Sequence, residues 1–239
     1  MSRPERPDGA PWRNFYGRRH GKKLRKGQAD LLDTHLAELA PPGLSWADNP
    51  ERHPLDLAAL YPKAREVWLE IGFGGGEHML AQAQANPDVQ IIGAEPFING
   101  VAKLLAAIER AGVTNLSVTS EDARNVLDVL PAGSLGRAFL LYPDPWPKAR
   151  HHKRRFANPE QLVPLARAMA PGATLRIATD IEDYVRHTLS VMARLEQFQW
   201  VADGPSDWRQ PWSDWPGTRY EAKALREGRR PCYLTFVKS

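Results

Sequence analysis

One segment of this 239-residue sequence combines a carboxylate, a flat aromatic ring and an unusually rigid backbone. Residues 143–147, with the sequence PDPWP, follow the apolar run LLY at 140–142. Because each proline ring fixes φ, such a loop can hold Asp144 and Trp146 at set positions, as catalysis requires. We expect Asp144 to be the central carboxylate of an active site. The alternative is a structural proline-rich loop whose aspartate is satisfied locally.

A glycine-rich loop is the second candidate. Gly72, Gly74 and Gly76 follow an apolar segment at 67–71 and precede a helical pattern at 77–85. Glycines at a strand-to-helix turn let backbone N–H groups approach a ligand closely. The spacing is GxGxG, not the GxGxxG of a pyrophosphate site, and no P-loop Lys or Ser/Thr follows. The pattern predicts a nucleotide-like ligand that needs no phosphates; a tight turn without a ligand is the alternative.

Three acids stand where the first three expected strands end: Glu70, Glu95 and Asp122. The carboxyl ends of parallel strands share one edge of the sheet, where ligands bind. We expect Glu95 to accept from both ribose hydroxyls and Asp122 from an adenine amino group. Acids repel phosphates and favour a cationic, phosphate-free nucleoside such as S-adenosylmethionine. Each acid alone is also typical of a solvated strand end, and an NAD site also places an acid after the second strand.

Positive charge is concentrated in two stretches. The formal net charge is only +4, yet residues 1–28 contain nine Lys/Arg against two acids, and residues 148–155 contain five Lys/Arg and no acid. Lys and Arg beside a site are what an RNA substrate requires, although a charge run is more often a solvated face. The expected RNA-contact residues are Arg150, His151, His152, Lys153, Arg154 and Arg155. No acid or Cys accompanies the two histidines, so we expect no metal site.

Strand and helix patterns alternate along most of the chain. Strands are expected at 67–71, 89–94, 116–119, 135–142 and 174–179, with helices at 77–85, 99–111, 125–130, 159–170 and 181–195. Two further strands, at 198–201 and 232–237, leave no obvious helical crossover before the last one. This alternation predicts an α/β fold. The expected architecture is a Rossmann-like seven-stranded sheet with helices on both faces, mostly parallel with an antiparallel C-terminal strand.

The composition sets the expected organisation. We expect a basic flexible arm at 1–28, an N-terminal helix with a Pro-rich connector at 29–64, and a catalytic domain at 65–239. No apolar run approaches 18 residues and the basic N-terminus has no apolar core, so neither a membrane span nor a secretory signal is expected. The single cysteine, Cys232, fits a reducing, cytoplasmic setting.

Four strings occur in order and together resemble the bacterial tRNA (guanine-N7)-methyltransferases. They are EIGFGGGE at 70–77, PDPWPK with KRRF at 143–156, ATD at 178–180 and TRYE at 218–221. The resemblance implies methyl transfer from S-adenosylmethionine, leaving S-adenosylhomocysteine, to N7 of the guanine at position 46 in the tRNA variable loop. It implies that Glu70, Glu95, Asp122 and Asp144 line the cofactor site. It also implies that Lys148, Asp180, Thr218, Arg219, Tyr220 and Glu221 contact the guanosine or help to shape its pocket, and that residues 150–155 contact RNA.

Several alternatives stay open at this point. Thr218 and Glu221 also read as a helix capping box. Either Asp144 or Asp180 could polarise the guanine, and the protein could work as a monomer or a homodimer. The alternative functions are methylation of another RNA or of a small molecule, an NAD-dependent oxidoreductase, and a non-catalytic RNA-binding protein on a methyltransferase fold.

Overall fold

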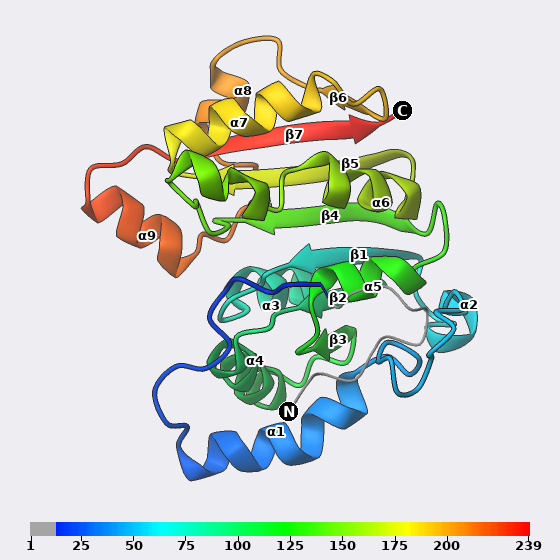
Figure 1. Ribbon diagram of the computed structural model, residues 1–239. Coiled ribbons are helices and arrows are strands. Elements are labelled where there is room, and N and C mark those ends of the chain that lie inside the picture. The colour runs from blue at the N-terminus through cyan, green and yellow to red at the C-terminus, as the bar shows by residue number, and fades with distance from the viewer. Residues whose placement is uncertain (1–12) are drawn as a thin grey trace.

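A single twisted sheet organises the computed structural model, which describes residues 13–239 (Figure 1). Its seven strands lie in the order β3-β2-β1-β4-β5-β7-β6. Their bounds are β1 Glu66–Ile71, β2 Val89–Ala94, β3 Leu116–Thr119, β4 Leu135–Leu141, β5 Met169–Thr179, β6 Phe198–Trp200 and β7 Cys232–Lys238.

Helices connect the strands. The bounds are α1 Lys26–Leu39, α2 Leu57–Leu60, α3 Glu77–Ala85, α4 Ile98–Ala111, α5 Ala123–Val129, α6 Pro159–Ala168, α7 Glu182–Met192, α8 Ser206–Arg209 and α9 Arg219–Arg226, with a 3₁₀ helix, η1, at Ala149–Arg154. The patterns missed the short elements α2, η1 and α8. A single turn carries too few residues for a periodicity to be read.

The first five strands pair parallel with one another, whereas β7 pairs antiparallel with both β5 and β6. The fold prediction, including the antiparallel last strand, is therefore confirmed. The boundary between α6 and β5 was misplaced, since β5 was expected to begin at 174 and begins at Met169. The helix expected to reach 170 ends at Ala168, because Met169 already pairs with Leu135 and begins β5.

Two cores cover the two faces of the sheet, because successive side chains of a strand point to opposite faces. On β1, Leu69 packs with α5, α6 and α7, while Trp68 packs with α3 and α4. Adjacent residues Ile91 and Ile92 on β2 divide in the same way. Over β4 and β5 the second face is covered by the loop that contains Trp212 and Trp215 rather than by a helix.

The carboxyl ends of β1 to β5 meet at one edge, on the left in Figure 1. Residues 13–25, drawn in blue, cross this edge before α1 begins at Lys26. The division into arm, connector and catalytic domain stays a prediction, and residues 1–12 of the expected arm lie outside the described residues.

Candidate active site

A cavity of about 730 Å³ opens at the carboxyl edge of the sheet. Its walls are the glycine loop, the ends of β2 and β4, the segment after β3, part of the basic segment and residues 13–18. The expected site residues that line it are Gly72, Gly74, Glu95, Asp122, Asp144, Lys153, Arg154, Arg155 and Tyr220. A cleft of this size at this edge is where an α/β fold binds a nucleoside.

Glycines are required both within the glycine loop and at Gly100 of α4, which packs against it. Gly72, Gly74 and Gly76 have φ of +70°, +59° and +77°, which a residue with a Cβ rarely adopts. The carbonyl oxygen of Gly74 also lies 2.0 Å from where a Cβ on Gly100 would stand, so α4 starts directly against the loop. The loop thereby presents backbone, not side chains, to the cavity.

Glu95 fixes this loop from the next strand. Its carboxylate accepts hydrogen bonds from the backbone N–H of Gly74 at 2.7 Å and of Phe97 at 2.8 Å. Burial raises the pKa of Glu95, and the two backbone donors counter the shift only in part. The side chain lines the cavity and keeps lone pairs that can accept further hydrogen bonds, while its contact with ribose hydroxyls stays a prediction.

Glu70 has a different environment from Glu95. It is 2% exposed and not among the residues that line the cavity, and its carboxylate hydrogen-bonds the ring Nδ1 of His78 at 2.7 Å. This buried pair closes the base of the glycine loop, since Glu70 precedes the loop and His78 follows it in α3. The sequence analysis did not predict a role for His78. A histidine eight residues after the strand-end acid, on the first turn of the next helix, was the available signal.

Asp122 is held by its own helix. Its carboxylate caps α5 by accepting the backbone N–H of Arg124 at 2.9 Å, and it also binds the Arg124 guanidinium at 2.6 Å. The aspartate still lines the cavity. A ligand amino group would therefore meet a carboxylate that is already oriented by two partners.

Asp144 contrasts with the other acids, because it has no hydrogen-bond or ion-pair partner among residues 13–239. The side chain is exposed to the cavity, and partial desolvation there raises its pKa. The surrounding backbone is strained: Tyr142 and Trp146 both have left-handed conformations without being glycine, at φ of +48° and +41°. An unpaired carboxylate on a strained loop is a typical feature of a functional site.

Arg155 holds this loop from behind. Its side chain is fully buried and donates to the carbonyls of Pro145 at 2.9 Å and Trp146 at 3.4 Å, and to the carboxylate of Asp183. The ring of Tyr184 lies 5.3 Å from the guanidinium. Arg155 was expected to contact RNA; the structure places it inside, where it determines the shape of the 143–147 loop.

The rest of the basic segment lies on η1. Arg150 and Lys153 are exposed, and Lys153 lines the cavity mouth. Arg154 lies over the rings of Tyr16 at 4.3 Å and Trp146 at 5.0 Å. The ring of His151 contacts Trp146 edge-on, and desolvation, followed by the positive side chains around it, lowers the pKa of His151. His152 lies 3.6 Å from Asp183.

The two remaining substrate candidates in this half of the edge differ in their surroundings. Asp180 is paired with the guanidinium of Arg229, which also binds Glu227. Lys148 is exposed and free of ion pairs within the described chain. Neither residue lines the cavity.

The TRYE segment forms the start of α9. Thr218 caps the helix by accepting the backbone N–H of Glu221 at 3.1 Å. The Glu221 carboxylate is buried and accepts from Trp215 Nε1 at 2.8 Å and from the Tyr233 hydroxyl. The capping interpretation is therefore half right: the threonine caps the helix, and the glutamate anchors it to the tryptophan loop and to β7.

The neighbouring residues of α9 face the glycine loop. Tyr220 lines the cavity and stacks on Tyr142 with ring centroids 6.5 Å apart. Burial raises the pKa of Tyr142 well above its ordinary value. Arg219 lies 3.5 Å from Glu77 on α3. The segment thus joins the glycine loop to the 142–147 loop across the cavity.

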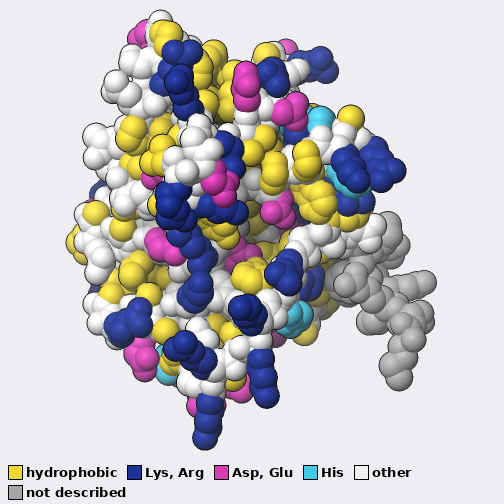
Figure 2. Space-filling view, turned by 90° about the vertical axis from the view of Figure 1, so that its left-hand side faces the viewer, with side chains coloured by type: hydrophobic (Ala, Val, Ile, Leu, Met, Phe, Trp, Pro, Cys, Tyr) yellow, Lys and Arg dark blue, Asp and Glu magenta, His cyan; other side chains and the backbone are white. Residues whose placement is uncertain are grey.

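Figure 2 views the same edge directly. Many Lys and Arg side chains lie on this face, both across its middle and toward its rim, with acidic and apolar side chains between them. None of the helices in residues 13–239 is long and apolar enough to cross a membrane. The same residues contain no cluster of three or more metal-ligating side chains.

The sheet order, the inserted antiparallel β7 and the glycine loop at the carboxyl edge define a Rossmann-like methyltransferase. Solved structures agree in fold. The 16S rRNA methyltransferase KamB matches with a TM-score of 0.53 at 16% identity, covering 78% of this chain and 95% of that one. The antibiotic-resistance methyltransferase Kmr matches at 0.51 and 21%, covering 77% and 91%.

Sequence comparisons are more specific. A family described as putative methyltransferase matches residues 64–234. A tRNA (guanine-N(7)-)-methyltransferase of Roseobacter denitrificans is 62% identical, covering 95% of this chain and 97% of the relative. Relatives of the same name from a Ruegeria species and from Rhodospirillum rubrum are 61% and 51% identical, covering 96% and 93% of this chain and 89% and 86% of their own. The chain belongs to the tRNA (guanine-N(7)-)-methyltransferase family.

Proposed function

We propose that this enzyme transfers a methyl group from S-adenosylmethionine to N7 of the guanine at position 46 in the tRNA variable loop. The observation that carries the proposal is the unpaired carboxylate of Asp144, held between a glycine loop for a nucleoside cofactor and a basic segment for RNA. The relatives that share this name support the choice of base and of RNA. The proposed substrate also favours a cytoplasmic location.

The residues around the cavity fit the cofactor. Glu95 would accept from the ribose hydroxyls and Asp122 from the adenine amino group, while the backbone of Gly72 and Gly74 borders the cavity between them. The cavity acids add a negative field that suits a sulfonium. S-Adenosylmethionine supplies an electrophilic methyl group when bound. S-Adenosylhomocysteine, the neutral-sulfur product, would bind the same residues.

Guanine N7 has a lone pair and no proton, so no residue needs to act as a base toward it. The protein has to orient the base and to stabilise the positive charge that N7 gains. A carboxylate that accepts from guanine N1–H or the amino group would do both. Asp180 is neutralised by Arg229, whereas Asp144 is free, so the geometry favours Asp144 for this role.

The RNA backbone would be bound outside this pocket. Arg150 and Lys153 are exposed at its rim and can bind phosphates. Arg155 is buried and would contribute by shaping the loop rather than by touching RNA. The stacked rings of Tyr142 and Tyr220 lie beside the cavity, where they can contact a flat base.

The deciding experiment supplies labelled S-adenosylmethionine and unmodified tRNA, then maps 7-methylguanosine by borohydride and aniline cleavage. We expect one cleavage, at the variable-loop guanine, that is absent with Asp144→Asn. Asp88→Asn is the matched control, since Asp88 is an exposed acid at the opposite edge, paired with Arg65. Transfer to another RNA or to a small molecule, or no transfer at all, would overturn the proposal.

A further inference from the structure

Residues 13–22 run across the carboxyl edge of the sheet and help to enclose the cavity (Figure 1). From the sequence, this segment was expected only to be part of a basic flexible arm. In the structure it contributes a continuous stretch of cavity wall: Arg13, Asn14, Phe15, Tyr16, Gly17 and Arg18. A basic tether alone would have no reason to lie against the cofactor half of the site.

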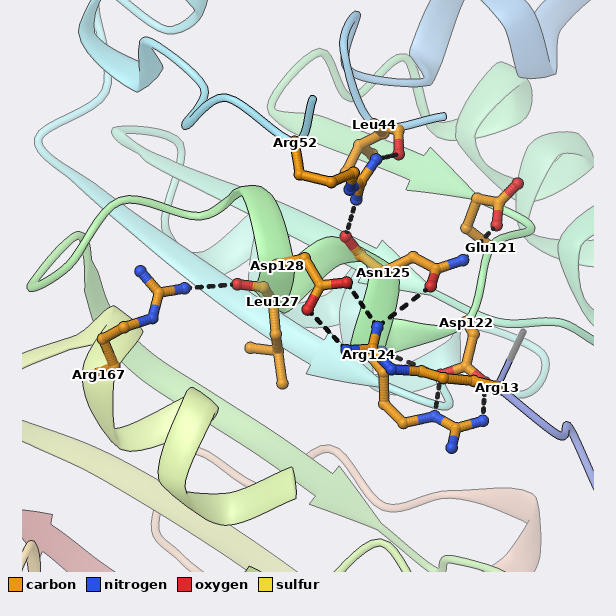
Figure 3. A network of polar contacts seen from close by, with 10 residues as sticks. All are labelled: Arg13, Leu44, Arg52, Glu121, Asp122, Arg124, Asn125, Leu127, Asp128 and Arg167. Atoms are coloured by element: carbon orange, nitrogen blue, oxygen red, sulfur yellow. Dashed lines mark hydrogen bonds and ion pairs between the residues drawn. The ribbon is translucent and has the colours of Figure 1, made fainter. Parts of the chain in front are cut away.

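One end of the segment is fastened to α5 (Figure 3). The Arg13 guanidinium binds Asp128 through two nitrogens, at 2.5 Å and 2.8 Å, and Asp128 is only 21% exposed. Arg124 donates to the backbone carbonyl of Asn14 at 3.0 Å while it also binds Asp122. The fastening therefore includes the arginine that orients the acid expected at the adenine.

The other end is fastened to the start of α4. The carbonyl of Arg19 accepts from the backbone N–H of Ile98 at 3.0 Å. The Asn99 side chain accepts from the N–H of Gly21 at 2.6 Å and donates to the carbonyl of Lys22 at 2.7 Å. This attachment, at Ile98 and Asn99, comes shortly after Glu95 in the chain.

A third contact lies in the middle. The ring of Tyr16 lies 4.3 Å from the Arg154 guanidinium, and 6.4 Å from the ring of Trp146 in an edge-on arrangement. The segment thus touches the 142–147 loop as well as both helices that follow the cofactor acids. Its two ends span the half of the edge between Glu95 and Asp122.

We propose that residues 13–22 form a strap across the cofactor cavity that slows departure of the bound nucleoside. The proposal rests on the function proposed above, because it takes the occupant to be S-adenosylmethionine or its product. A ligand that sits between Glu95 and Asp122 must leave past this strap or wait for an end to detach. Breaking either fastening should therefore accelerate dissociation, even without RNA.

The test measures S-adenosylhomocysteine binding to the full chain by calorimetry, and its dissociation rate by stopped-flow tryptophan fluorescence, with no RNA present. We expect Arg13→Gln to raise the dissociation rate about 5- to 10-fold, the scale of one lost charged hydrogen-bond pair at a partly exposed site. Lys23→Gln is the control: it removes the same charge from an exposed residue that makes no described contact.

A second pair of variants works at the other end and changes no charge. A Cβ on Gly21 would stand 2.8 Å from Asn99 Oδ1 and 2.9 Å from the Phe97 ring, so Gly21→Ala must disturb that fastening. Gly27→Ala meets nothing within 4 Å and serves as its control. We expect faster dissociation with Gly21→Ala and an unchanged rate with Gly27→Ala. Circular dichroism melts verify that each variant is folded.

The outcomes separate the two proposals. If the wild-type chain fails to bind S-adenosylhomocysteine, the proposed function itself is wrong. If it binds and both Arg13→Gln and Gly21→Ala release the ligand at the wild-type rate, the cofactor site stands and the strap is overturned. Faster release by both, with wild-type rates in Lys23→Gln and Gly27→Ala, supports the strap.

Discussion

Two loops border the same cavity and are shaped in opposite ways. The glycine loop, residues 72–76, reaches its left-handed positions at Gly72, Gly74 and Gly76, where they cost little. The 142–147 loop reaches left-handed positions at Tyr142 and Trp146, at about 1–3 kcal/mol each. The residues of the glycine loop themselves permit its conformation. The second loop must be held in shape by other residues.

Arg155 is the residue that holds it. Its buried guanidinium binds the carbonyls of Pro145 and Trp146 and connects them to Asp183 at the start of α7. The conformation of a loop that its own residues determine can be predicted from its amino-acid composition. The conformation of a loop that a distant side chain holds cannot be predicted in this way. Substitutions in the two loops should therefore have different consequences. Those in the glycine loop should affect cofactor binding or stability, and those in the 142–147 loop should affect turnover.

The largest effect should come from the reactive carboxylate of the 142–147 loop. We expect Asp144→Asn to lower kcat about 100- to 1,000-fold, because the charge that stabilises a cationic base is lost. Steady-state kinetics with unmodified tRNA measures this. A loss of S-adenosylhomocysteine affinity with unchanged kcat would show instead that Asp144 serves the cofactor, and so would break the comparison.

The pH profile sharpens the same point. Desolvation raises the pKa of Asp144, and the residue acts in its ionised form, so activity is present above that pKa and lost as the pH falls through it. The acidic limb of the kcat profile should therefore lie at a higher pH than the pKa of an ordinary aspartate would place it. In Asp144→Asn this limb should vanish. An acidic limb at the same pH in both proteins would assign the titration to another group.

The next effect tests the clamp. We expect Arg155→Lys to lower kcat about 10- to 100-fold while the dissociation constant for S-adenosylhomocysteine stays unchanged, since an ammonium keeps the charge but cannot hold two carbonyls and a carboxylate in one plane. The control is Arg150→Lys, an exposed position of the same segment that does not line the cavity. A purely structural role would lower the melting temperature of Arg155→Lys without separating kcat from cofactor binding.

A smaller effect is expected from the glycines, on stability. Gly76→Ala should lower the free energy of unfolding by about 3 kcal/mol, because a positive φ and contact with the Leu104 Cβ at 2.9 Å add up. Gly72→Ala meets nothing within 4 Å, so its positive φ alone should cost about 1 kcal/mol. Urea denaturation distinguishes them. Equal losses would mean that the backbone, not packing, determines both.

The smallest effect concerns the rim. Replacing Lys153 or Arg150 by Gln should weaken tRNA binding modestly and reduce the magnitude of the salt slope of log K by about one per lost phosphate contact. Turnover at saturating tRNA should be unchanged, since neither residue shapes either loop. Filter-binding titrations at several salt concentrations measure the slope. An unchanged slope would remove that residue from the RNA interface.

The sequence predicted the sheet, its strand ends and the glycine loop well, because these depend on local patterns. It placed Glu95, Asp122 and Asp144 at one edge correctly, since parallel strands end together. It could not show that Arg155 is buried, because its partners Asp183 and Tyr184 are about 28 residues away in sequence. The course of residues 13–22 was missed for the same reason, whereas the Glu70–His78 pair is local in sequence and its signal was overlooked.

The position of β7 has a consequence for biosynthesis. This strand is made last of all the strands, yet it lies between β5 and β6 and pairs with both. Leu234 and Phe236 from it are completely buried. The sheet therefore cannot close until residues 232–238 have emerged from the ribosome, after the other six described strands. A chain cut short after α9 would expose an unpaired β5 edge and be a target for aggregation or proteolysis.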